Sequence, residues 1–244
     1  MAKRTQSSRA SHEKRPRKGR KNSPGNSRDR PGDLRIVGGK YRGRKLRYQP
    51  FCVEENLVTR PMKDRVREAI FNLVGLEVQG RYAIDLFAGT GALGLEAISR
   101  GAVGVTFIEK HVPTARVVEA NIISLDVQSI AELKTTSAFL WTKRDMSDAD
   151  FGMRNTELDQ PSETLHSWIV FCSPPYAFYR ERQDDMLELI TAVTERAPEG
   201  SLVVVEADDR FDFNLLPGGP VGEKRTDRWQ VRTYLPAVVG VWRG

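Results

Sequence analysis

A glycine-rich loop separates a strongly apolar run from a helical pattern. Residues 85–94 read Asp-Leu-Phe-Ala-Gly-Thr-Gly-Ala-Leu-Gly, and Gly89, Gly91 and Gly94 match the pattern G-x-G-x-x-G. Glycine lets the backbone turn tightly and lets a ligand approach closely, while a helix start offers free N–H groups. Glu109 lies 20 residues after Gly89, at the end of the next predicted strand, where a carboxylate can accept both hydroxyls of a ribose. The spacing predicts a site for an adenosine-containing cofactor.

The identity of that cofactor depends on Asp85. A nicotinamide or flavin dinucleotide and S-adenosylmethionine both carry an adenosine, and a third interpretation is a tight turn without a ligand. Asp85 lies four residues before the first loop glycine. Its carboxylate suits the positively charged amino-acid end of S-adenosylmethionine and not an anionic pyrophosphate. We therefore predict S-adenosylmethionine as the cofactor. The residues predicted to bind it from this pattern are Asp85, Phe87, Ala88, Gly89, Thr90, Gly91 and Glu109.

A second motif, Ser173-Pro174-Pro175-Tyr176, directly follows the apolar run 168–172. Ligands bind at the carboxyl ends of the strands in an open α/β sheet. The two prolines hold an extended turn and lack N–H donors, so their carbonyl groups can accept hydrogen bonds from an exocyclic amine. Tyr176 can stack on a base. The alternative is that the prolines end the strand and Tyr176 packs against the core. Next to the glycine loop, the motif predicts catalysis on a base amine by these four residues.

Alternating strands and helices must position both motifs. Apolar runs predict strands at 82–87, 103–108, 130–136, 168–172 and 201–206, with helices at 59–75, 92–100, 113–124, near 139 and at 182–196. Runs at 222–226 and 230–239 predict a closing antiparallel pair, and residues 35–46 predict a hairpin that turns at Gly38-Gly39. This order is typical of a mostly parallel sheet covered on both faces, an α/β Rossmann-like architecture.

Composition and charge exclude several classes of protein. The chain has 244 residues, of which 39% are hydrophobic, and no apolar run reaches the length of a membrane span. Its two cysteines and three histidines show no metal-ligand or disulfide spacing, and no secretory signal is apparent. Residues 1–33 carry 11 Lys/Arg and 3 Asp/Glu, a net +8, whereas the remainder is −2. We expect a cytoplasmic monomer without a metal site, with a disordered basic tail that contacts a polyanion or only aids solubility.

Three segments resemble the RsmD family of guanine-N2 methyltransferases that act on small-subunit ribosomal RNA. They are residues 35–46, residues 59–72 and residues 85–100, and the resemblance extends over about residues 34–240. It implies a class I methyltransferase fold with seven strands, the last antiparallel, and a small N-terminal hairpin extension. It also implies S-adenosylmethionine as the methyl donor and a guanine of ribosomal RNA, within an assembling small subunit, as the target. We predict three parts of the chain: a tail at 1–33, an extension at 34–58 and a catalytic domain at 59–244 with a polar loop at 143–166.

Two positions depart from the family pattern. Ser173 stands where the family has the Asp of its D-P-P-Y/F motif, and Ser137 stands where an Asp precedes Ala138 beside the adenine. The resemblance implies that Ser137 and Ala138 contact the cofactor. Serine carries no charge, and proton-accepting help is worth about 10²–10⁴ in rate. Three outcomes stay open: slower methylation of guanine N2, methylation of another amine such as adenine N6 or cytosine N4, or RNA binding as an assembly factor with weak turnover.

Basic residues near the N-terminal extension provide a place for RNA. Lys40, Arg42, Arg44 and Lys45 cluster on the predicted hairpin, and Arg60 and Arg65 lie at the start of the following helix. Phosphate contacts from such residues position a nucleic acid without specifying its sequence. The alternative is a solvated charged surface, in which some of the helix arginines pair with Asp64 or Glu68.

Overall fold

The structure is a computed structural model that describes Met1 and residues 34–49, 52–53, 56–57, 64–146, 166–218 and 229–244. Within these ranges no helix is both long and apolar enough to cross a lipid bilayer. The predicted tail, the predicted strand 222–226, Arg60 and most of the predicted loop 143–166 lie outside the described residues. The domain boundaries predicted from the sequence remain predictions.

The core is a seven-stranded sheet with the order β5-β4-β3-β6-β7-β9-β8. Neighbours from β5 to β7 pair in parallel, whereas β9 is antiparallel to both β7 and β8. The strands are β3 (Tyr82–Asp85), β4 (Gly104–Ile108), β5 (Ala131–Lys134), β6 (Trp168–Cys172), β7 (Leu202–Asp208), β8 (Trp229–Tyr234) and β9 (Ala237–Arg243). Strands β3, β4, β6 and β7 are buried throughout, which explains their continuous apolar runs. The predicted fold class is confirmed.

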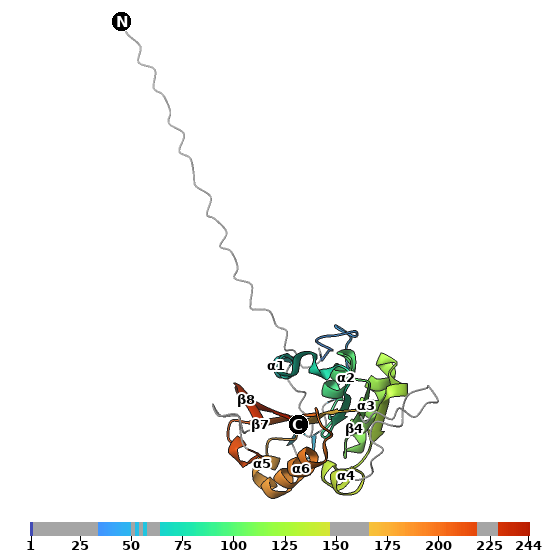
Figure 1. Cartoon of the computed structure of the whole chain (residues 1–244). Coiled ribbons are helices and arrows are strands. Elements are labelled where there is room, and N and C mark those ends of the chain that lie inside the picture. The colour runs from blue at the N-terminus through green and yellow to red at the C-terminus, as the bar shows by residue number, and fades with distance from the viewer. Residues whose placement is uncertain (2–33, 50–51, 54–55, 58–63, 147–165, 219–228) are drawn as a thin grey trace.

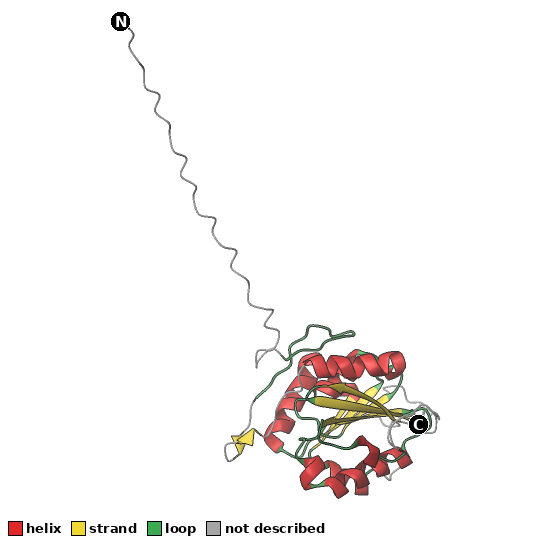
Figure 2. Cartoon of the chain, turned by 90° about the vertical axis from the view of Figure 1, so that its left-hand side faces the viewer, coloured by secondary structure: helices red, strands yellow, loops and turns green. Residues whose placement is uncertain are grey.

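Helices cover both faces of this sheet (Figures 1 and 2). Alternate strand residues enter two separate cores: Ile169 and Phe171 pack with residues of α1, α2 and α3, whereas Val170 and Cys172 pack with residues of α4 and α6. The helices are α1 (Asp64–Val74), α2 (Ala92–Ser99), α3 (Val112–Leu125), α4 (Ala138–Arg144), α5 (Phe178–Glu181) and α6 (Gln183–Arg196). Short 3₁₀ helices occupy Gly75–Val78, Gln128–Ile130 and Phe213–Leu215.

The closing pair of strands differs from its prediction. The run 230–239 is not one strand, because the chain turns at Leu235 and Pro236 between β8 and β9. The turn carries no Gly, Asn or Asp, and Pro236 is the residue in it that signals a turn. Two smaller differences occur elsewhere. Helix α4 continues to Arg144, into the predicted loop, and the short helix α5 follows the Ser173–Tyr176 segment without having been predicted.

The N-terminal segment 34–49 is a docked loop with little strand character. One antiparallel bridge joins Arg35 to Lys45, and the chain reverses over residues 37–43, a loop that contains the predicted turn residues Gly38 and Gly39 but is longer than those two residues. Gly39 is needed for another reason. Its φ is +73°, and a Cβ there would overlap the carbonyl oxygen of Ser99 at the end of α2. A two-stranded ribbon of β1 (Cys52–Val53) and β2 (Asn56–Leu57) follows.

A buried carboxylate on α2 holds the N-terminal segment in place. Glu96 is fully buried, and its two oxygens accept hydrogen bonds from the backbone N–H groups of Val37 and Gly38, both at 2.7 Å. Its carboxylate also pairs with Arg100 at 2.8 Å and with the fully buried Arg67 at 3.5 Å. Glu96 therefore joins α1, α2 and the N-terminal segment in one charged network.

Replacing Glu96 with alanine is expected to lower the free energy of unfolding by about 3–5 kcal/mol, because Arg67 would remain buried without its Glu96 partner. Urea denaturation measures this change. The matched control is Glu188→Ala on α6, which removes an exposed pair with Lys143 and should cost less than ~1 kcal/mol. Equal effects of the two substitutions would contradict a structural role of the Glu96 network.

Candidate active site

The glycine loop connects β3 to α2 at the carboxyl edge of the sheet. Gly89 and Gly91 have φ values of +55° and +77°, conformations that favour glycine. Gly91 directly precedes the first residue of α2. Gly94 lies inside the helix, and a Cβ there would overlap the Phe107 ring on β4. The third glycine of the pattern therefore serves close packing of helix on sheet, and the first two shape the loop.

Asp85 ends β3 beneath this loop and is almost fully buried. Its Oδ2 accepts a hydrogen bond from the Gly94 N–H at 3.1 Å, while its Oδ1 is buried without a hydrogen-bond partner among the described residues. Burial raises the pKa of Asp85 to about 7, and the charge of Glu109 adds to this rise. A buried acceptor without a partner fits the ammonium group of S-adenosylmethionine, so the residues present suit the predicted cofactor.

Glu109 follows β4 and lies beside the same loop. Its Oε2 accepts the Gly89 N–H at 2.9 Å and its Oε1 accepts the His111 N–H at 2.8 Å. Each carboxylate oxygen can accept a second hydrogen bond, so these contacts orient Glu109 and leave capacity for ribose hydroxyls. The backbone of Thr90, in the middle of the loop, is held from α3: Asn121 Nδ2 donates to the Thr90 carbonyl at 2.9 Å.

Asn121 also binds the N-terminal segment, a role that the sequence analysis missed. Its Oδ1 accepts the Arg47 N–H at 2.6 Å and its Nδ2 donates to the Arg47 carbonyl at 3.0 Å. A single fully buried amide thus bridges the glycine loop and the N-terminal segment. A lone Asn on an otherwise apolar helix face is the only signal for it in the sequence.

The Ser173–Tyr176 segment leaves the sheet at the end of β6. The Ser173 hydroxyl donates a hydrogen bond to Glu206 Oε2, and the Tyr176 hydroxyl donates to Glu206 Oε1 at 2.6 Å. The Pro175 carbonyl was expected to be free, but it accepts a hydrogen bond from the Phe178 N–H at 2.9 Å. Tyr176 is half-buried with its hydroxyl engaged, and burial together with Glu206 raises its pKa above the usual range.

Glu206 was missed by the sequence analysis, which treated it only as the end of a strand. It lies on β7 with only 5% of its surface exposed, and burial raises the pKa of its carboxyl group. The parallel register pairs Cys172 with Val205, so the next residues along each strand, Ser173 and Glu206, meet at the carboxyl edge. In the sequence, the signal for Glu206 is a carboxylate at the end of an apolar run. Its contact with Ser173 could not be predicted, because it depends on which strand lies next to β7 in the sheet.

Ser137 and Ala138 lie at the start of α4, where Ser137 directly precedes the helix and Ala138 is buried. Three aromatic rings, those of Phe87, Phe139 and Phe178, cluster nearby with centroids 6.0–6.1 Å apart. Each ring follows a different strand of the sheet, namely β3, β5 and β6. The cluster gives this edge an apolar surface, and the Arg182 guanidinium lies 3.9 Å from the centroid of Phe139.

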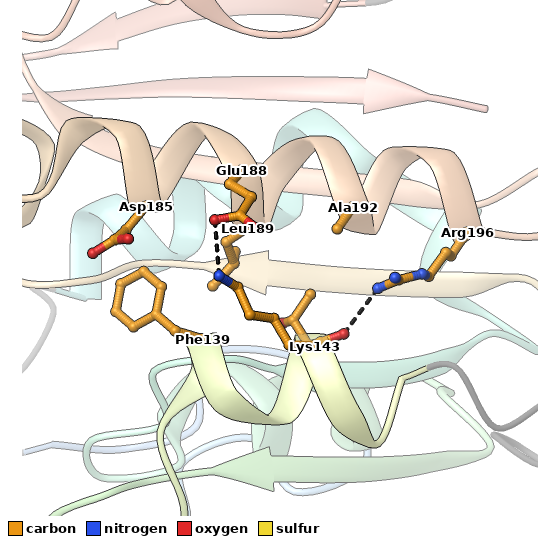
Figure 3. A pocket seen from close by; sticks show the side chains of 8 residues that line it. Phe139, Lys143, Asp185, Glu188, Leu189, Ala192 and Arg196 are labelled. Carbon is orange, nitrogen blue, oxygen red and sulfur yellow. Dashed lines mark hydrogen bonds and ion pairs between the residues drawn. The ribbon is translucent and has the colours of Figure 1, made fainter.

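A small cavity lies between α4 and α6 rather than at the strand ends (Figure 3). Its charged groups interact locally: Lys143 Nζ lies 2.9 Å from Glu188 Oε2, and Arg196 donates to the Thr142 carbonyl at 2.8 Å. Paired charges leave no group directed at a ligand, so this cavity is not the candidate site. Cys172 is not a nucleophile either, because burial raises the pKa of its thiol to about 12.

Five of the six basic residues predicted to contact RNA lie in the described part of the chain, and all five are exposed. Lys40, Arg42, Arg44 and Lys45 are exposed on the N-terminal segment, as is Arg65 on α1. Arg44 Nη2 also donates to the Ser124 carbonyl on α3 at 2.5 Å. Arg67 is different: it is fully buried and pairs with Asp64 at 2.7 Å, which is the alternative expected for some helix arginines.

The fold and the site define a class of protein. An open, mostly parallel seven-stranded sheet with one antiparallel strand, and a glycine loop after β3, which lies between β4 and β6, is the class I methyltransferase fold. S-adenosylmethionine is the cofactor of that class, as predicted. The chain belongs to the family described as Conserved hypothetical protein 95, whose model matches residues 34–219. The predicted resemblance to the RsmD family is confirmed by its relatives.

Two curated relatives and one solved structure illustrate the similarity. The chain is 38% identical to Ribosomal RNA small subunit methyltransferase D of Escherichia coli strain K12, over 76% of this chain and 80% of the relative. It is 32% identical to the Putative rRNA methyltransferase YlbH of Bacillus subtilis strain 168, over 74% of this chain and 85% of the relative. The solved structure of the putative methyltransferase yhhF from Escherichia coli is 27% identical with a TM-score of 0.60, over 86% of this chain and 97% of that one.

Proposed function

We propose that this chain transfers a methyl group from S-adenosylmethionine to an exocyclic amine of ribosomal RNA, namely N2 of a guanine in the small subunit. One observation carries the proposal: the two motifs leave adjacent parallel strands. Asp85 on β3 is paired with Phe171 on β6, and the Leu86 N–H donates to the Phe171 carbonyl at 3.0 Å. The glycine loop and the Ser173–Tyr176 segment therefore begin side by side at one edge of the sheet.

The cofactor side of this edge is assigned to the glycine loop. S-adenosylmethionine supplies an electrophilic methyl group on a positively charged sulfur. Asp85 would accept a hydrogen bond from the ammonium group through its unpartnered Oδ1, and Glu109 would accept the ribose hydroxyls. The backbone of residues 87–91 would line the methionine part, with Ser137 and Ala138 beside the adenine.

The amine side is assigned to the Ser173–Tyr176 segment. Ser173 Oγ can accept an N–H of the target amine, because its own proton is directed to Glu206. Pro174 adds a carbonyl group that accepts no backbone hydrogen bond within the described residues. Tyr176, held through its hydroxyl, would stack on the extruded base. No covalent intermediate is needed for direct displacement.

Ribosomal RNA is favoured as the substrate by two observations. The relatives named above carry ribosomal RNA in their names, and the exposed basic side chains of the N-terminal segment provide phosphate contacts. In this proposed function, the chain acts as a cytoplasmic monomer on an assembling small subunit.

Incubation with tritiated S-adenosylmethionine and small subunits from cells lacking this gene is expected to label the small-subunit ribosomal RNA. Nucleoside mass spectrometry of the product should identify N2-methylguanosine. Labelling of adenine N6 or cytosine N4 would assign the activity to another amine, and labelling of DNA alone would exclude RNA as the substrate. Cofactor-independent binding of the RNA without labelling would instead indicate an assembly factor. Ser173→Ala/Tyr176→Ala is the matched control and should not label the RNA.

A further inference from the structure

Among the described residues, Glu206 is the carboxylate that forms hydrogen bonds with the Ser173–Tyr176 segment. Both of its oxygens are occupied by hydroxyl donors, Ser173 at Oε2 and Tyr176 at Oε1. Within the described part of the chain it forms no ion pair, and it is nearly inaccessible to solvent. A buried carboxylate without a cationic partner is costly to a fold. Such a cost points to a function at this edge.

We propose that Glu206 is a positioning residue that supplies, from β7, the negative charge that Ser173 cannot supply from β6. This inference rests on the proposed function. Glu206 Oε2 orients the Ser173 hydroxyl so that its proton faces the carboxylate and its lone pairs face the amine. Glu206 Oε1 fixes the Tyr176 ring, whose hydroxyl remains a donor because its pKa is raised.

The same hydrogen bonds form a path for the proton that the amine must lose. When the N–CH₃ bond forms and the carbon–sulfur bond breaks, the electron pair of the broken bond stays on sulfur and the nitrogen becomes positively charged. One N–H proton then moves to Ser173 Oγ while the Ser173 hydroxyl proton moves to Glu206 Oε2. Glu206 ends neutral, Ser173 is unchanged, and the proton later leaves to water. Charge and protons balance without another reactant.

The environment of Glu206 increases its affinity for a proton. Burial raises its pKa, and the hydrogen bonds from Ser173 and Tyr176 oppose that rise only in part. The other titratable groups around it are Tyr179 on α5, whose pKa is also raised by burial, and Asp208 on β7, which pairs with Arg180 at 3.1 Å. A raised pKa makes the ionised carboxylate a stronger proton acceptor.

Glu206→Gln removes the charge and keeps the size of the side chain. The single-turnover rate of methyl transfer is expected to fall by about 10²–10⁴, while the affinities for S-adenosylmethionine and RNA stay unchanged. The wild-type rate should increase as the pH rises through the pKa of Glu206. The variant should lack this pH-dependent increase. The matched control, Asp208→Asn, removes a carboxylate two residues away on the same strand. It should retain both the wild-type rate and its increase with pH.

Moving the carboxylate tests its role more directly than removing it. In the double variant Ser173→Asp/Glu206→Gln the negative charge returns at the end of β6, and the rate should recover at least about tenfold over Glu206→Gln alone, a part of the general-base effect. A merely structural Glu206 would give no recovery, because the double variant restores no packing on β7. Unchanged rates in Glu206→Gln at every pH would overturn the inference.

A second measurement does not require activity. In cofactor-free protein with ¹³C-carboxyl glutamate, the Glu206 resonance is assigned by its absence from Glu206→Gln. Its pKa should lie above the ordinary glutamate value and rise further in Ser173→Ala, because one stabilising hydrogen bond is lost. If the wild type labels no RNA, the proposed function fails, yet a pKa that responds to Ser173 would still support the coupling. If the pKa of Glu206 is the same in the wild type and in Ser173→Ala, the inference is overturned in either case.

Discussion

Asp85→Asn is expected to weaken the binding of S-adenosylmethionine at pH 8 by a factor on the order of 10², because a buried charge partner of the ligand ammonium is lost. Wild-type affinity should increase as the pH rises from 5.5 to 8, since the pKa of Asp85 is raised to about 7 and only the ionised carboxylate attracts the ammonium. The variant should show no such increase. Isothermal titration calorimetry at several pH values measures both effects.

The same substitution weakens cofactor binding but should make the ligand-free folded chain more stable at pH 8. Because the pKa of Asp85 is raised in the folded chain, the folded state binds more protons than the unfolded state between about pH 4 and pH 7. The contribution of Asp85 to stability is therefore fully present below about pH 4 and is lost as the pH rises to about 7. Without ligand, Asp85→Asn should melt at a higher temperature than the wild type at pH 8. Equal affinities of the two proteins at pH 8 would contradict the cofactor assignment.

Replacing Lys40, Arg42 and Lys45 together with alanine is expected to weaken RNA binding at low salt by a factor on the order of 10–10². The slope of log affinity against log salt should become shallower by about 0.7–0.9 for each lost phosphate contact. Arg44 is left in place because it donates to the Ser124 carbonyl and contributes to docking of the segment. Filter binding with small-subunit ribosomal RNA over a range of salt concentrations measures both quantities.

A triple variant of equal charge serves as the control for that experiment. Lys143, Arg144 and Arg232 are exposed on other parts of the chain, and their replacement with alanine should leave the salt slope close to that of the wild type. Affinity for S-adenosylmethionine should be unchanged in both triple variants. Equal losses in the two would show that net charge, and not the N-terminal segment, governs RNA binding.

Local pattern was sufficient for most of the sheet. Strand β6 is predicted residue for residue at 168–172, because a parallel strand buried on both faces must be apolar throughout. The glycine loop and the position of Asp85 at its start were also predictable, since tight turns restrict residue type locally. The same reasoning failed for β8 and β9, because their turn has no Gly, Asn or Asp and the signal from Pro236 was not used.

The sequence by itself established the alternation of strands and helices from β3 to β7 except for α5, the two motifs, and the resemblance to the RsmD family. Only the tertiary structure decided which groups meet. Glu206 contacts Ser173 because β7 lies next to β6 in this register, and Glu96 is buried because the N-terminal segment folds over α2. Gly39 is required by a carbonyl group 60 residues later in the chain. The physical reason is common to all three: pattern reports the burial and backbone preference of each residue, whereas the partner of a buried polar group depends on chain segments that are distant in sequence.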